Sequence, residues 1–237
     1  MSGHSKWATT HRAKSAVDSK RGAVFTKLTR AISSAARSGG GNPESNFKLR
    51  LAMDQARAAN MPKDNIERAI AKATGQGGDV QLEAVTYEGF GPHGVAVIVE
   101  CLTDNRNRTS HEIRHLFEGR GGHIGTPGSV GWQFERTGIV TTATVSPDDE
   151  LALIDLGASD IRRDDREVTV LCPPAQLEAV RKFFNSRGVA AEAKLGLLPK
   201  ETKPLASEKE VADLQTLLDQ LDDHPDVQEC HHNAESP

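Results

Sequence analysis

A predominantly hydrophobic segment runs from Val95 to Leu102 and is followed directly by a polar turn. A short apolar run rich in β-branched residues is typical of a strand buried on both faces. The box Thr109-Ser-His-Glu112, placed before further apolar residues, predicts a capped helix start. Backbone N–H groups and the helix dipole favour anions, phosphate above all, at such a junction. In the alternative interpretation, the turn only caps the helix and its arginines point into solvent. The predicted anion or partner contact comprises Asp104, Asn105, Arg106, Asn107 and Arg108.

The first 77 residues predict a small basic helical domain. A helix over about 19–38 places its apolar residues on one arc and four basic residues on the opposite side, namely Lys20, Lys27, Arg30 and Arg37. A second helix is expected to start at Asn42-Pro43-Glu44 and to end near Asn60, and a third spans about Lys63–Thr74. Residues 1–17 show no helical or strand period and are interpreted as an extended basic arm.

Strand patterns follow a glycine linker. Residues 82–88 predict a strand, and the turn from Gly89 to Gly94 matches G-x-G-x-x-G. A strand rather than a helix follows these glycines, so we do not interpret them as a dinucleotide-binding site. Gly119 is expected to end the next helix, and Val130–Phe134 is predicted as a strand.

From Gly138 the elements are expected in the order β-α-β-β-α-β, which is the ferredoxin-like arrangement. A last helix opens with the capping box Ser207-x-x-Glu210, and Asp226–His232 follows as a strand. One helix and one strand cannot form a domain alone, so both are expected to return to the earlier sheet. The predicted fold class is α+β: a helical domain at 1–77, a discontinuous α/β domain at 79–134 plus 201–233, and an inserted ferredoxin-like domain at 135–200.

The net charge of −4 hides a strong asymmetry along the chain. Residues 1–75 hold 14 Lys and Arg against 5 Asp and Glu, whereas the remainder holds 15 against 28. A basic module beside an acidic body indicates a polyanion partner. The candidate nucleic-acid contacts are Lys6, Arg12, Lys14, Lys20, Arg21, Lys27, Arg30, Arg37, Lys48 and Arg50. No apolar run approaches a membrane span and no signal peptide is recognised, so we expect a cytoplasmic protein.

The strongest enzymatic signal is His111-Glu-Ile-Arg-His115, which has the H-E-x-x-H spacing of zinc hydrolases. Arg114 would place a cation beside the metal, and Gly119 ends the helix one turn later. The favoured interpretation is therefore a pair of surface histidines, with a zinc hydrolase as a distant alternative. Three cysteines without a C-x-x-C spacing indicate buried thiols. Nothing in the sequence requires an enzyme, a metal or a cofactor.

Three segments together resemble the YebC family. They are the N-terminal stretch with Gly3-His-Ser-Lys-Trp7, Lys20-Arg-Gly22 and Phe25-Thr-Lys-Leu28; the run from Ala58 to Ile70; and Tyr87-Glu-Gly89 with Val95–Thr109. The family includes bacterial proteins labelled transcriptional regulators and the mitochondrial translational activator of cytochrome oxidase subunit I. Departures from the family pattern at His111, His93 and Cys230-His231 leave open which branch this chain represents.

The resemblance implies a three-domain, cytoplasmic, non-enzymatic binder of nucleic acid. Some members bind promoter DNA, and others act on the ribosome and relieve stalling, including at proline runs. Carried over to this sequence, the family's positions are the arm around His4–Trp7, Lys20-Arg21, Lys27 and the Asp104–Arg108 loop. We therefore predict a DNA-binding transcriptional regulator, with a ribosome-associated translation factor that binds ribosomal RNA as the alternative. Without a base-reading motif, binding should be directed to the phosphate backbone and sensitive to salt. The sequence leaves the oligomeric state open.

Overall fold

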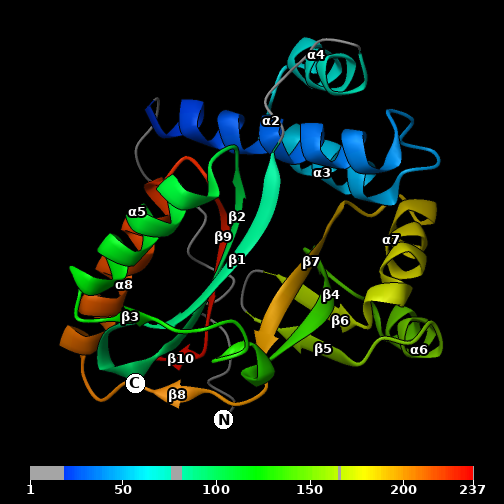
Figure 1. The fold of residues 1–237 in the computed structure, drawn as a ribbon. Helices are drawn as coiled ribbons and strands as arrows, with labels where there is room; N and C mark the ends of the chain where they lie inside the picture. Colours follow the sequence, from blue (N-terminus) through cyan, green and yellow to red (C-terminus); the bar gives the residue numbers. More distant parts are fainter. Residues whose placement is uncertain (1–18, 76–81, 165–166, 237) are drawn as a thin grey trace. The chain divides into compact units, whose positions relative to one another are not determined.

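The structure is a computed structural model that describes residues 19–75, 82–164 and 167–236. The chain divides into two compact units: one comprises residues up to Phe134 together with those from Pro199 onward, and the other is Glu135–Leu198. N-terminal helices precede mixed helices and strands (Figure 1), so the predicted α+β class is confirmed. The finer division of the first unit into a helical and an α/β domain stays a prediction.

The described part of the first unit begins with three helices: α2 (Ser19–Gly39), α3 (Phe47–Ala58) and α4 (Lys63–Thr74). Their shared core centres on Ile32, Leu49 and Ala56, all with no exposed surface. The expected start of α3 at Asn42 is wrong, because the buried amide of Asn46 caps the helix instead. The Asn46 side chain accepts a hydrogen bond from the Leu49 N–H (3.1 Å) and donates to the carbonyls of Ala35 and Gly40 (both 2.8 Å).

An antiparallel sheet with strand order β3-β1-β2-β9 follows the helices in this unit. Its strands are β1 (Glu83–Phe90), β2 (Ala96–Thr103), β3 (His123–Ile124) and β9 (Val227–His232). Seven of the eight β2 residues are buried, which confirms a strand buried on both faces. The pairing of β9 with β2 confirms that the C-terminal strand returns to the earlier sheet.

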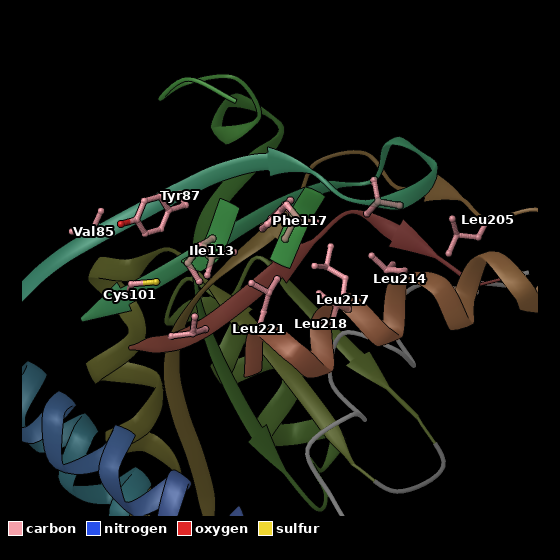
Figure 2. Packing of buried hydrophobic residues seen from close by; sticks show 14 residues of the cluster. Val85, Tyr87, Cys101, Ile113, Phe117, Leu205, Leu214, Leu217, Leu218 and Leu221 are labelled. Carbon is pink, nitrogen blue, oxygen red and sulfur yellow. The ribbon is translucent and has the colours of Figure 1, made fainter. Parts of the chain in front are cut away.

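Helices α5 (Arg106–Glu118) and α8 (Glu208–Asp223) contribute to the core beside this sheet. Figure 2 shows Ile113 and Phe117 of α5 together with the leucines of α8 in a cluster with side chains of β1 and β2. Ser207 caps α8 by accepting a hydrogen bond from the Glu210 N–H (3.3 Å), as the capping box predicts. A 3-10 turn, η1 (Pro92–Gly94), connects β1 to β2, and short strands β8 (Lys203–Pro204) and β10 (Ala234–Glu235) pair in parallel.

The predicted strand at Val130–Phe134 is wrong. Residues Gly131–Gln133 form a 3-10 turn, η2, and the strand β4 runs from Phe134 to Thr142. The reason is that Glu88 of β1 accepts the backbone N–H groups of Val130 (2.9 Å) and Gly131 (2.6 Å). Those groups are therefore not available for a strand ladder.

The second unit has the expected element order. Its elements are β4, α6 (Pro147–Asp155), β5 (Asp160–Arg163), β6 (Val168–Cys172), the 3-10 turn η3 (Pro174–Gln176), α7 (Leu177–Ser186) and β7 (Ala191–Pro199). The strand order β5-β6-β4-β7 is that of a ferredoxin-like sheet. Ser146 caps α6 through the Asp149 N–H (3.1 Å), and Leu153, Leu177 and Phe184 are fully buried in the core.

Candidate nucleic-acid interface

Two cations on the basic side of α2 bond to the α/β part of the first unit. The Lys27 ammonium donates a hydrogen bond to the carbonyl of Asp222 at the end of α8. The Arg30 guanidinium donates to the carbonyls of Leu102 (3.1 Å) and Pro225 (3.2 Å) and forms an ion pair with Asp226. These two residues, which the sequence suggested as nucleic-acid contacts, therefore attach α2 to the end of α8 and to the adjacent end of the sheet.

Asp226 is the centre of this attachment and has no exposed surface. Besides Arg30, its carboxylate accepts hydrogen bonds from Arg108 and Thr109 (both 2.7 Å) and from Thr103 (3.2 Å). Burial alone would raise the pKa of this carboxyl, yet the bonds from Thr109, Arg30 and Arg108 hold it well below its usual range. Sequence reasoning missed Asp226, because its partners come from positions more than a hundred residues away.

The Asp104–Arg108 loop has a different local structure from the one expected. Helix α5 begins at Arg106, and the Asn105 side chain caps it by accepting the Arg108 N–H (3.1 Å). The predicted start at the Thr109 box is wrong, because the Thr109 hydroxyl bonds to Asp226 and to the Asn105 carbonyl (3.1 Å).

Both arginines of this loop face carboxylates. Arg108 contacts Asp104 (2.8 Å) as well as Asp226, and Arg106 lies 3.4 Å from Glu83. Asn107 is exposed. An anion at this junction would compete with carboxylates that are already in place, and the predicted second contact through the loop stays a prediction.

The other predicted cations differ in their setting. Arg37 is exposed in the last turn of α2 and lines a hollow of about 170 Å³ with Ser33, Ser34, Ser38 and Leu82. Lys48 is exposed on α3, and the guanidinium of half-buried Arg50 lies 5.8 Å from the Phe47 ring centre. Lys6, Arg12 and Lys14 fall outside the described residues, and so do the side chains of Lys20 and Arg21.

The H-E-x-x-H histidines lie on the surface of α5. His111 and His115 are both exposed, and Glu112 between them lies 3.0 Å from Nε2 of His224. Within the segments that the structure describes, neither histidine belongs to a group of three potential metal ligands. One such group is formed on the sheet by Glu100, Glu229 and His231, whose ligand atoms lie within 4.8 Å of one another.

The G-x-G-x-x-G turn connects two antiparallel strands, as its surroundings in the sequence indicate. His93 within it has a φ of 59°, and its Nε2 lies 3.0 Å from Asp213 of α8. Both residues line a polar hollow of about 380 Å³ with Arg120 and Thr216. No helix among the described residues is long and apolar enough to cross a membrane.

Comparison with known proteins covers nearly the whole chain. Residues 5–76 match the family model described as the TACO1/YebC protein N-terminal domain, and residues 82–234 match that of the TACO1/YebC second and third domain. A probable transcriptional regulatory protein of Caldanaerobacter subterraneus subsp. tengcongensis is 44% identical over 240 residues, covering 99% of this chain and 98% of the relative. One from Desulfotalea psychrophila is 46% identical over 237 residues, covering 98% and 95%. The crystal structure of a conserved hypothetical protein from Aquifex aeolicus superposes with a TM-score of 0.88 at 40% identity, covering 98% of both chains.

Proposed function

Because this chain belongs to the TACO1/YebC family, we propose that it is a non-enzymatic regulator of gene expression that binds nucleic acid through its basic N-terminal module. Relatives carry the name probable transcriptional regulatory protein, and DNA is the first target proposed here. The proposal places the protein in the cytoplasm, with no cofactor.

The charge of α2 is the observation that supports this proposal. The helix contains Lys20, Arg21, Lys27, Arg30 and Arg37 and no acidic residue. A surface of one sign attracts a polyanion and concentrates it near the protein. The hollow beside Arg37 adds the hydroxyls of three serines to a guanidinium, and hydroxyl and guanidinium donors are the groups that contact phosphate oxygens.

Two of the candidate cations, both on α2, also have a structural role. Lys27 and Arg30 bond α2 to the α/β part, so their loss would weaken this attachment as well as remove positive charge. We assign direct phosphate contact to Lys20, Arg21, Arg37 and Lys48, together with the cations of the N-terminal arm. Such contacts position the protein on the backbone without reading base sequence.

A ribosomal RNA target is the second candidate. Outside residues 1–75 the chain carries 15 Lys and Arg against 28 Asp and Glu. This acidic remainder would repel a long duplex wrapped around the protein, whereas insertion of the basic end alone into an RNA cavity avoids that repulsion.

Binding of the full-length protein to labelled duplex DNA, measured by fluorescence anisotropy over a series of salt concentrations, tests the proposal. If five of these seven cations contact duplex phosphates, the slope of log K against log salt should be roughly −4 to −5. The triple variant Arg21→Ala, Arg37→Ala, Lys48→Ala removes three proposed contacts and should make the slope of log K against log salt less negative by about 2.7. The matched control Arg162→Ala, Lys182→Ala, Lys209→Ala removes the same charge from exposed positions elsewhere and should leave the slope unchanged.

Co-sedimentation with ribosomes in a sucrose gradient distinguishes the two targets. The translation factor is favoured if the protein associates with ribosomes and does not bind duplex DNA tightly. The Arg21, Arg37, Lys48 variant should then lose ribosome association, and the control variant should keep it. A slope near zero together with absence from ribosomes would refute nucleic-acid binding by this module.

A further inference from the structure

The segment from Gly125 to Gln133 is fixed by a network centred on Glu88. The Glu88 carboxylate accepts the N–H groups of Gly128 (2.8 Å), Val130 (2.9 Å) and Gly131 (2.6 Å). Burial would raise the pKa of Glu88, but these three backbone bonds lower it below its ordinary value. A Cβ at position 131 would lie only 3.1 Å from the carboxylate, so this glycine allows the close approach. The segment is therefore an ordered platform.

Trp132 lies on this platform with its side chain directed outward. It is 68% exposed and is the only aromatic among the large apolar residues that the described segments leave exposed. Its indole N–H donates to the Ser129 carbonyl (3.2 Å), so the polar atom of the ring is already bonded within the loop. An indole buried in a core would remove a large apolar area from water, and here that area is left accessible.

Lys200, which is distant in the sequence, bonds to the backbone of Trp132 and Gln133. Its backbone N–H donates to the Gln133 carbonyl (2.8 Å), and its ammonium donates to the Trp132 carbonyl (3.0 Å). Lys200 is exposed, and an ammonium has three N–H donors. An exposed indole and an exposed ammonium therefore belong to the same bonded loop, because the ammonium is held at the backbone carbonyl of the tryptophan itself.

We propose that Trp132 is a stacking site for an unpaired nucleobase and that Lys200 contacts the adjoining phosphate. An aromatic face with a neighbouring cation is the combination that proteins use to bind single-stranded nucleic acid, because every base has a face to stack. In a duplex, stacking between adjacent base pairs covers the faces of the bases, so the site selects single-stranded segments. This inference rests on the proposed function and adds to it a contact with a base, outside the basic helical module.

Tryptophan fluorescence tests the stacking directly. The sequence has two tryptophans, so the full-length Trp7→Phe variant reports on Trp132 alone. We would titrate it with a single-stranded oligouridine and with a chain of the same length made of abasic residues, while a labelled oligouridine measures binding separately by anisotropy. Stacking predicts quenching by oligouridine and none by the abasic chain.

Affinity for the oligouridine gives the second measurement, in the same Trp7→Phe background. Trp132→Ala should weaken binding about 5- to 100-fold, and Trp132→Phe should recover much of the loss. Leu151→Ala is the matched control, because Leu151 is 67% exposed on α6 and its loss should leave binding unchanged. Lys200→Gln should weaken binding of the base-containing and abasic chains alike.

The outcomes separate this inference from the proposed function. If oligouridine binds without quenching Trp132 fluorescence, and Trp132→Ala leaves its affinity unchanged, the stacking site is overturned. The basic module would then remain the binding surface, and exposed Trp132 would be assigned to a protein partner instead. If the Trp7→Phe parent protein binds neither single-stranded nor duplex nucleic acid, both proposals are overturned.

Discussion

Substitution of Asp226 by asparagine tests whether the buried ion pairs hold the N-terminal helices on the α/β part of the first unit. The asparagine side chain would have almost the same shape but no charge, so Arg30 and Arg108 would both lose their buried partner. Breaking a buried ion pair from one side costs about 3–5 kcal/mol. The side chains of Arg30 and Arg108 keep 23% and 42% of their exposure, so water can partly replace the carboxylate. We therefore expect a loss of about 2–3 kcal/mol.

Urea unfolding followed by circular dichroism, and thermal melting, measure this loss. A domain of this size loses about 2–4 °C in Tm per kcal/mol, so Tm should fall by about 5–10 °C. Hydrogen exchange should also become faster in α2, which Arg30 attaches to the sheet. Asp104→Asn is the matched control: it removes an exposed partner of the same Arg108 (2.8 Å) and should cost no more than about 1 kcal/mol.

The dependence on pH gives a sharper test of the same interaction. The pKa of Asp226 is lowered in the folded state, so its stabilisation is complete well above the unfolded value of about 3.9 and is lost as the pH falls through the folded pKa. The difference in stability between the wild type and Asp226→Asn should therefore be constant from pH 7 to pH 5 and shrink below about pH 4. A Tm change under 2 °C, with no convergence in acid, would refute the reasoning.

Three further predictions concern other parts of the fold. Glu88→Gln should speed hydrogen exchange of the Gly128, Val130 and Gly131 amides, since an uncharged amide is a weaker acceptor than the carboxylate; unchanged exchange would mean that the loop holds its shape without the charge. Asn46→Ala should cost about 2–3 kcal/mol in urea unfolding, because it removes a helix cap and two buried hydrogen bonds, whereas a loss below 0.5 kcal/mol would contradict the capping role. Burial raises the pKa of Cys101 to about 12, so this thiol should react with a disulfide reagent at pH 8 only after unfolding, as peptide mapping of the labelled cysteine would show; rapid native labelling would disprove its burial.

Local signals in the sequence were sufficient to predict much of the fold. The bounds of α4 agree with Lys63–Thr74, and Ser207 caps α8 as its capping box predicts. The apolar run from Val95 predicts the central strand of the sheet. These features depend on residues within one turn or one strand of each other, and periodicity and capping patterns describe that range well.

Two of the errors arose where a distant residue competes for a local group. Thr109 has the sequence context of a helix cap, but its hydroxyl is used by Asp226, 117 positions away. The strand pattern at Val130–Phe134 is overridden by Glu88, which takes its backbone N–H groups. The same limit applies to the candidate site: charge patterning finds Lys27 and Arg30, but it does not distinguish a cation that contacts phosphate from one that bonds to a carbonyl or carboxylate of its own chain.

The pairing of β2 with β9 has a consequence for the order in which the protein can fold during synthesis. Glu100 and His231 lie 3.4 Å apart across these strands but are 131 residues apart in the chain. Until β9 has been made, the most buried strand of the sheet has an open edge, although the second unit, Glu135–Leu198, is already complete. Exposed strand edges promote association between chains. The nascent protein should therefore be most prone to aggregation late in its translation. Once β9 has left the ribosome and paired with β2, this tendency should end.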